Sequence, residues 1–201
     1  MTTVSIDTKK RIIEAAAYLF AEKGFDGTST REIGRRAGVN IASLNYHYKS
    51  KQNLMEEVAS FAVFEFRQRL QMLTEENVNS TEEFAVKLFQ TLHADGHRSL
   101  NLFKIFLDSE HCDILMGETP ICYDELNLYL SKDLNSKVPE SERLWFYHVV
   151  FNYLMHTVVM SLTNAGKSHF MKYYPKEDKL AVRYITQLVQ TLIRDLNQRY
   201  A

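Results

Sequence analysis

The feature that most constrains the fold is a dense set of helix start and stop signals in residues 29–51. Ser29 followed three residues later by Glu32 is a capping box, which predicts the start of a short helix. Gly38 ends that helix, because a residue without Cβ adopts the left-handed conformation of a sharp turn at little cost. The stretch therefore predicts a short helix that ends in a tight turn.

A second short helix is expected directly after the turn. Asn40 is a favoured N-cap residue, and the helix runs to about Tyr48 with Leu44 as its inner anchor; Ile33 and Ala37 are the inner face of the first helix. An ordinary helical hairpin has the same glycine turn. Small and apolar residues in the first exposed turn, with basic residues around both helices, favour a DNA-binding helix-turn-helix, because they allow close approach to a groove and its phosphates.

Residues 8 to about 57 resemble the DNA-binding domain of the TetR/AcrR family of bacterial transcriptional regulators. The resemblance rests on the leading helix KKRIIEAAAYLFAEKGFDGTST, on the GV turn, and on SLNYHYKSKQNLM, which is similar to the family segment T-L-Y-x-H-F-x-S-K-x-x-L. We therefore expect an all-α protein of about nine helices. Residues 1–51 would form a three-helix helix-turn-helix DNA-binding domain, and residues 52–201 a helical ligand-binding and dimerisation domain.

Helical periodicity and capping residues predict the other elements. Three prolines and seven glycines argue against a loop-rich β architecture, and no strand pattern or repeat competes. The predicted helices, besides the two above, cover residues 8–23, 50–73, 80–94, 99–111, 121–136, 139–164 and 175 to the C-terminus.

The formal net charge of -1 conceals an uneven distribution. Residues 1–51 carry nine Lys and Arg against five Asp and Glu, a net charge of +4. Residues 52–201 carry fifteen against twenty, a net charge of -5. The basic charge therefore coincides with the helix-turn-helix, as expected for DNA binding.

Cysteine usage and the N-terminus point to a cytoplasmic protein. Cys112 and Cys122 have neither a CxxC spacing nor a cluster of partners, so no disulfide scaffold or zinc finger is expected. The first residues lack the apolar segment of a secretory signal.

One apolar segment, residues 144–162, has no formal charge and approaches the length of a membrane span. His148, Asn152 and His156 recur every four residues and form a polar stripe, which would be costly against lipid. A buried helix of a bundle is therefore favoured over a transmembrane helix.

Two kinds of DNA contact are expected. Helix N-terminal amides, Lys51 and the Tyr46 hydroxyl would hold phosphates without reading sequence, whereas bases would be read by the first turn and a half of the second helix. The predicted DNA-binding residues are Thr30, Arg31, Asn40, Ile41, Ala42, Ser43, Asn45, Tyr46, His47 and Lys51.

The predicted base-reading surface departs from the family pattern. Ile41 and Ala42 donate no hydrogen bond from their side chains but can pack on thymine methyl groups. The family often has tyrosine where this chain has Asn45, so the role of that tyrosine is not carried over. Arg31 becomes the candidate for a bidentate contact to guanine. One domain buries too little surface to select a genomic site, so a homodimer on a palindromic operator is expected.

The resemblance also implies a pocket for a small organic effector between the middle helices, where residues 80–165 are rich in aromatic side chains. The stripe of His148, Asn152 and His156 needs partners if buried, and a polar and aromatic pocket would supply them. The predicted ligand-binding residues are His93, Phe106, Tyr123, Tyr147, His148, Phe151, Asn152 and His156.

Two other interpretations of the stripe remain open. It can pair across a dimer interface, which the resemblance places on the last two helices; both have more apolar surface than one partner helix covers. It can also belong to a metal site with Asp108, Glu110 and Cys112, although asparagine is a poor transition-metal ligand, and no metal or cofactor is expected.

The sequence therefore predicts a transcriptional regulator, a repressor that releases a palindromic operator when a small organic ligand binds its C-terminal domain. The alternative is a DNA-binding regulator with no small-molecule ligand, controlled by a protein partner. An enzyme is not expected, because the chain has no phosphate loop, nucleophile elbow, paired carboxylates or HExxH motif.

Overall fold

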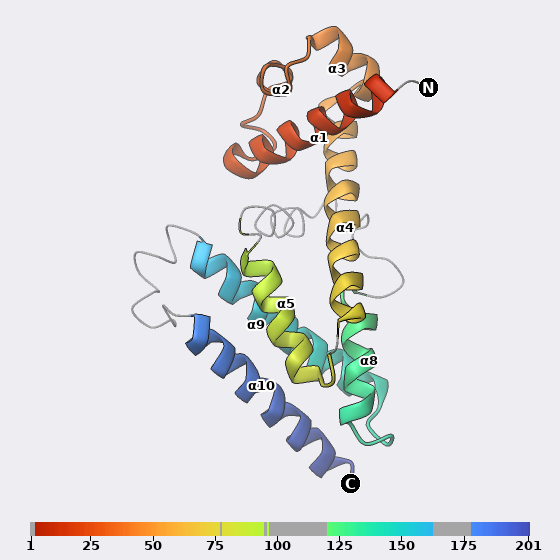
Figure 1. Cartoon of the computed structure of the whole chain (residues 1–201), viewed down its shortest axis with the longest axis vertical. Coiled ribbons are helices and arrows are strands. Elements are labelled where there is room, and N and C mark those ends of the chain that lie inside the picture. The colour runs from red at the N-terminus through yellow and green to blue at the C-terminus, as the bar shows by residue number, and fades with distance from the viewer. Residues whose placement is uncertain (1–2, 77, 95, 97–119, 163–177) are drawn as a thin grey trace. The chain divides into compact units, whose positions relative to one another are not determined.

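The computed structural model describes residues 3–76, 78–94, 96, 120–162 and 178–201 (Figure 1). These residues form eight helices and no strand, so the predicted all-α class is confirmed. They divide into two compact units, which we call the head, through Glu65, and the body, from Phe66 onward. The domain boundary expected after residue 51 stays a prediction.

The head is built from α1 (Thr3–Lys23), α2 (Thr30–Ala37), α3 (Ile41–Tyr48) and the first part of α4 (Lys51–Glu75). Helix α2 packs against both α1 and α3. Apolar residues at helical spacing on each of these elements meet in one core, as an amphipathic pattern requires. Its most buried side chains include Ile12, Ala16, Ile33, Leu44, Leu54 and Val58.

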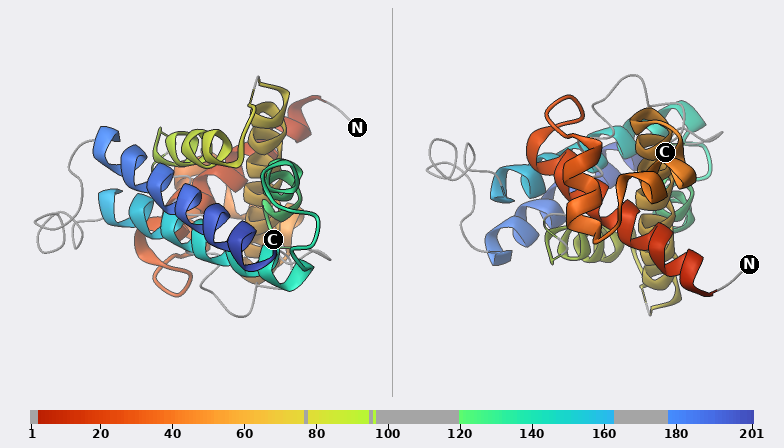
Figure 2. Two further views of the ribbon diagram at one scale, coloured as in Figure 1. Left: turned by 90° about the horizontal axis from the view of Figure 1, so that it is seen from below. Right: turned by 90° about the horizontal axis from the view of Figure 1, so that it is seen from above.

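The body contains the end of α4, then α5 (Thr81–Ala94), α8 (Tyr123–Asp133), α9 (Glu140–Leu162) and α10 (Asp178–Arg199). Helix α5 packs against α8, α9 and α10, and α9 and α10 lie side by side (Figures 1 and 2). The core between these helices includes Phe84, Phe89, Leu130, Phe146, Leu154, Ile185 and Val189.

The helix ends differ from the predicted ones where the sequence offers no clear cap. Helix α1 begins at Thr3 instead of residue 8. Helix α9 begins at Glu140, and the carbonyl of Pro139 accepts hydrogen bonds from the amides of Glu142 (3.1 Å) and Arg143 (3.3 Å), so Pro139 precedes the helix instead of occupying its first turn.

Some sequence predictions lie outside the described residues. They include the helix over 99–111, the start of the last helix at residue 175, Cys112, and Asp108 and Glu110 of the alternative metal site. Within the described part of the chain, no helix is both long and apolar enough to cross a bilayer, and this includes α9.

Candidate nucleic-acid interface

The start of α2 is fixed by the predicted capping box. The Ser29 hydroxyl oxygen accepts from the amide of Glu32 (3.2 Å), and the Glu32 carboxylate accepts from the amide of Ser29 (3.0 Å). The Lys23 ammonium donates to the same carboxylate (2.7 Å). The hydrogen bond from Lys23, followed by those from Ser29, lowers the pKa of Glu32 to about 2. This network ties the end of α1 to the start of α2.

The turn between α2 and α3 has the predicted glycine geometry. Gly38 has φ 66° and ψ 35°, a left-handed conformation that other residues adopt only with strain. The amide of Val39 donates to the carbonyl of Gly34 (2.9 Å) and that of Gly38 to the carbonyl of Arg35 (3.3 Å). These two bonds form a Schellman motif, which ends α2 and redirects the chain into α3.

Helix α3 is capped and anchored from its inner side. The Asn40 side-chain oxygen accepts from the amide of Ser43 (2.7 Å), as predicted. Leu44 is 1% exposed and Tyr48, four residues later on the same face, is 5% exposed. Tyr48 was not predicted as a second anchor, although its position four residues after Leu44 places it on the same face of the helix. Burial raises the pKa of Tyr48 to about 12, and its hydroxyl donates to the carbonyl of Lys9 in α1 (3.3 Å).

The opposite face of α3 is open. Ile41 is 39% exposed and Tyr46 83% exposed, and Ala42 and Asn45 between them are also exposed. This inner and outer division matches a recognition helix whose apolar side holds it on the domain. Of the other predicted DNA-binding residues, Arg31 and Asn40 are exposed, and those half-buried are Thr30, Ser43, His47 and Lys51.

Lys51 has internal partners that the sequence did not indicate. Its ammonium donates to the carbonyls of Phe25 (2.9 Å) and Thr28 (3.2 Å) and lies 4.1 Å from the centre of the Phe25 ring. An ammonium has three N–H donors, so one remains for a phosphate. The predicted phosphate contact stays a prediction; in the described structure Lys51 fastens the start of α4 to the loop before α2.

The junction between α3 and α4 contains a strained residue. Lys49 has φ 57° and ψ -43°, and the amide of Ser50 donates to the carbonyl of Tyr48 (2.5 Å), which closes a γ-turn of the rare positive-φ type. The Ser50 hydroxyl oxygen then caps α4 by accepting from the amide of Asn53 (3.0 Å). Helix α3 therefore meets α4 through a connection of two residues, Lys49 and Ser50.

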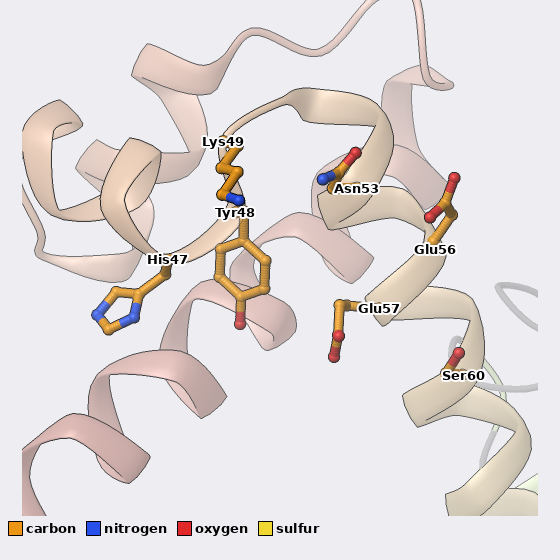
Figure 3. Close-up of a pocket in the computed structure, with 7 residues that line it drawn as sticks. All are labelled: His47, Tyr48, Lys49, Asn53, Glu56, Glu57 and Ser60. Atoms are coloured by element: carbon orange, nitrogen blue, oxygen red, sulfur yellow. The ribbon is translucent and has the colours of Figure 1, made fainter. Parts of the chain in front are cut away.

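A polar pocket of about 470 Å³ opens at this junction. Figure 3 shows the Tyr48 ring pointing from the end of α3, while the acidic residues lie along the first turns of α4. The residues that line this pocket are His47, Tyr48, Lys49, Asn53, Glu56, Glu57 and Ser60 (Figure 3).

The predicted effector-binding residues fall into separate places in the body. Tyr123, Tyr147 and Phe151 form one aromatic cluster, with ring centres 5.6 Å apart for the two tyrosines and 5.3 Å apart for Tyr147 and Phe151. The Tyr147 hydroxyl donates to the carbonyl of Ile121 (2.7 Å), and burial raises its pKa. The Tyr123 hydroxyl donates to Glu140, and burial also raises the pKa of Tyr123.

The polar stripe of α9 is on the surface of the chain. His148, Asn152 and His156 are all exposed, and the Asn152 amide donates to the carbonyl of His148 (2.8 Å). His93 stacks on Phe89 in α5 with ring centres 5.6 Å apart, and Phe106 lies outside the described residues. Among described side chains, no three of the His, Cys, Asp and Glu type gather as metal ligands would.

Comparison with known proteins agrees with this geometry. The family described as "Bacterial regulatory proteins, tetR family" matches residues 12–58, which covers α2, α3 and the flanking parts of α1 and α4. The probable HTH-type transcriptional regulator YttP of Bacillus subtilis is 38% identical over 103 residues, 50% of each chain. IcaR of Staphylococcus aureus, a negative transcriptional regulator of the biofilm operon icaADBC, is 27% identical over 137 residues, 67% of this chain and 71% of IcaR. The named relatives are regulators, in agreement with the expectation that the chain is not an enzyme.

The fold is shared over most of the chain, at low sequence identity. The fatty acid degradation regulator FadR of Bacillus halodurans superposes with a TM-score of 0.61 at 18% identity and covers 94% of each chain. GusR of Salmonella enterica gives a TM-score of 0.62 at 15% identity over 95% of each chain. The sequence match spans only half the length of YttP. The solved structures share the helical fold. The match over residues 12–58 places the helix-turn-helix segment of this chain in the TetR family of bacterial regulatory proteins.

Proposed function

We propose that this chain is a cytoplasmic transcriptional repressor that binds a palindromic operator as a homodimer and releases it when a small organic ligand binds the body. The observation that carries the DNA-binding part is the two-sided α3 helix. Leu44 and Tyr48 hold its inner face in the head, whereas Ile41, Asn45 and Tyr46 present an open outer face. An anchored helix with a small, exposed first turn can enter a major groove.

Base reading and phosphate binding come from different residues in this proposal. Arg31 is exposed in the first turn of α2 and carries a guanidinium that can bond to both acceptors of a guanine edge. Ile41 and Ala42 are suited to thymine methyl groups. Tyr46 is 83% exposed, and its hydroxyl suits a phosphate. The net charge of +4 over residues 1–51 supports the approach to DNA.

The homodimer in this proposal forms through α9 and α10. Trp145, His148, Asn152 and His156 lie on one exposed face of α9, at spacings of three and four residues. Leu180 and Tyr184 are exposed apolar residues on α10. A second copy of the chain would cover these residues in a bundle of four helices and place two heads on one palindrome.

Ligand control would act on the spacing of the two heads. Helix α4 belongs to the head through Glu65 and to the body from Phe66, so among the described helices it is the one that runs from the head into the body. In one state of the dimer the two recognition helices fit successive major grooves, and in another they are wrongly spaced. A ligand that binds the wrongly spaced state more tightly would weaken operator binding, to an extent set by the ratio of its affinities for the two states. The aromatic cluster of Tyr123, Tyr147 and Phe151 supports an effector with aromatic or apolar groups.

Binding-site selection from random DNA duplexes tests the DNA-binding part of the proposal. Wild-type protein should select a palindrome, and Arg31→Ala should change the preferred bases at a cost of ~1 to 3 kcal/mol. Tyr46→Phe is the comparison variant, because it removes a hydroxyl proposed to contact phosphate and not a base. Tyr46 is 83% exposed, so the substitution leaves the core intact. It should weaken binding to all sequences alike. Unchanged preference for Arg31→Ala would remove the guanine contact from the proposal.

The alternative of a regulator controlled by a protein partner differs in its ligand response. Thermal-shift screening with small apolar and aromatic compounds, followed by operator release, separates the two. A compound that raises the Tm and releases operator supports the ligand-controlled repressor. A compound that binds tightly and leaves operator affinity unchanged contradicts it.

A further inference from the structure

Arg11 of α1 makes a set of hydrogen bonds that the helix-turn-helix pattern does not include. Its Nε and Nη2 atoms donate to the carbonyl of Ala37 at 3.0 Å and 2.6 Å, and Nη2 also donates to the carbonyl of Gly38 at 3.0 Å. Ala37 is the last residue of α2 and Gly38 is the turn glycine. A residue 26 positions earlier in the chain therefore holds the turn that precedes α3.

These bonds add to the hydrogen bonding at the end of α2. The last carbonyls of a helix have no partner within it. The Schellman motif satisfies Gly34 and Arg35, and the Arg11 guanidinium satisfies Ala37 and Gly38. The guanidinium also places a positive charge at the helix end where the macrodipole is negative. Its two donors in one plane fix the orientation of the carbonyls as well as their distance.

The other end of the recognition helix is held by the same element. The Tyr48 hydroxyl at the end of α3 donates to the carbonyl of Lys9, two residues before Arg11 (3.3 Å). Helix α1 thus contacts the polypeptide on both sides of α3, at the turn before it and at its last residue. Asn40, the N-cap of α3, follows Gly38 by two residues, so rotation of the Gly38 peptide would tilt the helix.

We propose that Arg11 is a positioning residue for sequence recognition: it sets the direction in which the recognition helix leaves the turn, without contacting DNA. The inference rests on the proposed DNA-binding function. A small tilt of α3 displaces base contacts that need defined geometry, whereas contacts to phosphates tolerate it. Loss of Arg11 should therefore reduce binding to the preferred sequence more than binding to other DNA.

The test measures the affinity of the full chain for two duplexes of equal length. One is the sequence selected by the wild-type protein, and the other has the same base composition in scrambled order. Arg11→Ala should lose roughly ten-fold or more in affinity for the selected duplex, the loss expected for hydrogen bonds from a charged group. Its affinity for the scrambled duplex should match that of Lys10→Ala, which removes the same charge from the neighbouring exposed position of α1.

Two further variants separate positioning from stability. Phe20→Leu weakens the core at the other end of α1, where Phe20 packs on Phe25, and should lower the Tm without lowering the ratio of the two affinities. Arg11→Lys keeps the charge and loses the planar fork, so its ratio should lie between wild type and Arg11→Ala. If Arg11→Ala does not fold, Arg11→Lys carries the same comparison. Hydrogen exchange at the amides of Gly38 and Val39 should accelerate in Arg11→Ala and not in Lys10→Ala.

Three results would overturn the inference. The first is an unchanged affinity ratio in a folded Arg11→Ala protein. The second is an equal loss of affinity for both duplexes in Arg11→Ala, together with a slope of log affinity against log salt concentration that is smaller by about one. This result would mean that Arg11 contacts a phosphate directly. The third is an equal reduction of the ratio in Phe20→Leu, which would assign the effect to stability. A wild-type protein that selects no sequence would instead contradict the proposed function itself.

Discussion

The Asp133 carboxylate at the end of α8 accepts two hydrogen bonds from Thr81, one from its amide (2.8 Å) and one from its hydroxyl (2.6 Å). Thr81 is the first residue of α5 and is fully buried, so a side chain from another helix caps α5. Asn197 of α10 joins the same place: its amide donates to the Asp133 carbonyl (2.9 Å), and its oxygen accepts from the amide of Asn135 (2.7 Å). Polar groups therefore fasten three helices of the body at one point.

Asp133→Ala should lower the free energy of unfolding by about 2 to 3 kcal/mol, because it leaves the buried amide and hydroxyl of Thr81 without their acceptor. Asp133→Asn keeps an acceptor oxygen and should lose less. Urea unfolding of the full chain measures both. Ser131→Ala on the exposed side of α8 is the control and should change stability by no more than ~0.5 kcal/mol. An Asp133→Ala protein as stable as this control would show that the cap contributes nothing.

The lowered pKa of Glu32 predicts a pH dependence of the head. The folded pKa is about 2, below the ordinary value of 4.5, so the unfolded chain binds a proton first as the pH falls. The stabilisation by Glu32 is therefore complete above about pH 4.5 and is lost as the pH falls towards 2. Glu32→Gln should lower the Tm at neutral pH, and its difference from wild type should shrink between pH 4.5 and 2. A difference that stays constant over this range would contradict the assignment.

The strained γ-turn at Lys49 predicts an inverted preference for glycine. At most loop positions alanine is more stabilising than glycine, because glycine makes the unfolded chain more flexible. At the φ of 57° found for Lys49, a Cβ atom is disfavoured. Lys49→Gly should therefore be more stable than Lys49→Ala by ~1 kcal/mol. Both variants lose the same ammonium group, so thermal unfolding of the pair isolates the backbone effect; a more stable alanine variant would argue against the strain.

Local signals in the sequence were sufficient for the caps of the recognition motif. The capping box of Ser29 and Glu32, the left-handed Gly38 and the N-cap Asn40 are all confirmed, because each bond joins residues within a few positions of each other. Ser80 and Glu83, at the start of the helix predicted over residues 80–94, have the spacing of a second capping box, and this box is half formed. The Ser80 oxygen accepts from the amide of Glu83 (3.1 Å), but the Glu83 carboxylate accepts from the amide of Asn79 (3.0 Å), one residue earlier than expected.

Contacts between distant parts of the chain could not be predicted in this way. Arg11 meets Ala37 and Asp133 meets Thr81 across 26 and 52 residues, and no periodicity marks such pairs. The α9 stripe shows the same limit for the predicted effector site. Periodicity places His148 and Asn152 on one face, but the direction of that face depends on how α9 packs, and the structure places it on the surface. The role of the predicted effector residues stays a prediction.

The exposed face of α9 provides a direct test of the proposed dimer. In a two-fold interface each substitution occurs twice, and a carboxylate that becomes buried without a partner costs several kcal/mol. Asn152→Glu and Tyr184→Glu should therefore dissociate the dimer in sedimentation velocity at micromolar concentration and weaken operator binding. Leu128→Glu adds the same charge at an exposed apolar residue of α8 and should remain dimeric. A monomeric wild type, or equal dissociation by all three variants, would contradict an interface on α9 and α10, because the effect would then depend on net charge and not on the buried face.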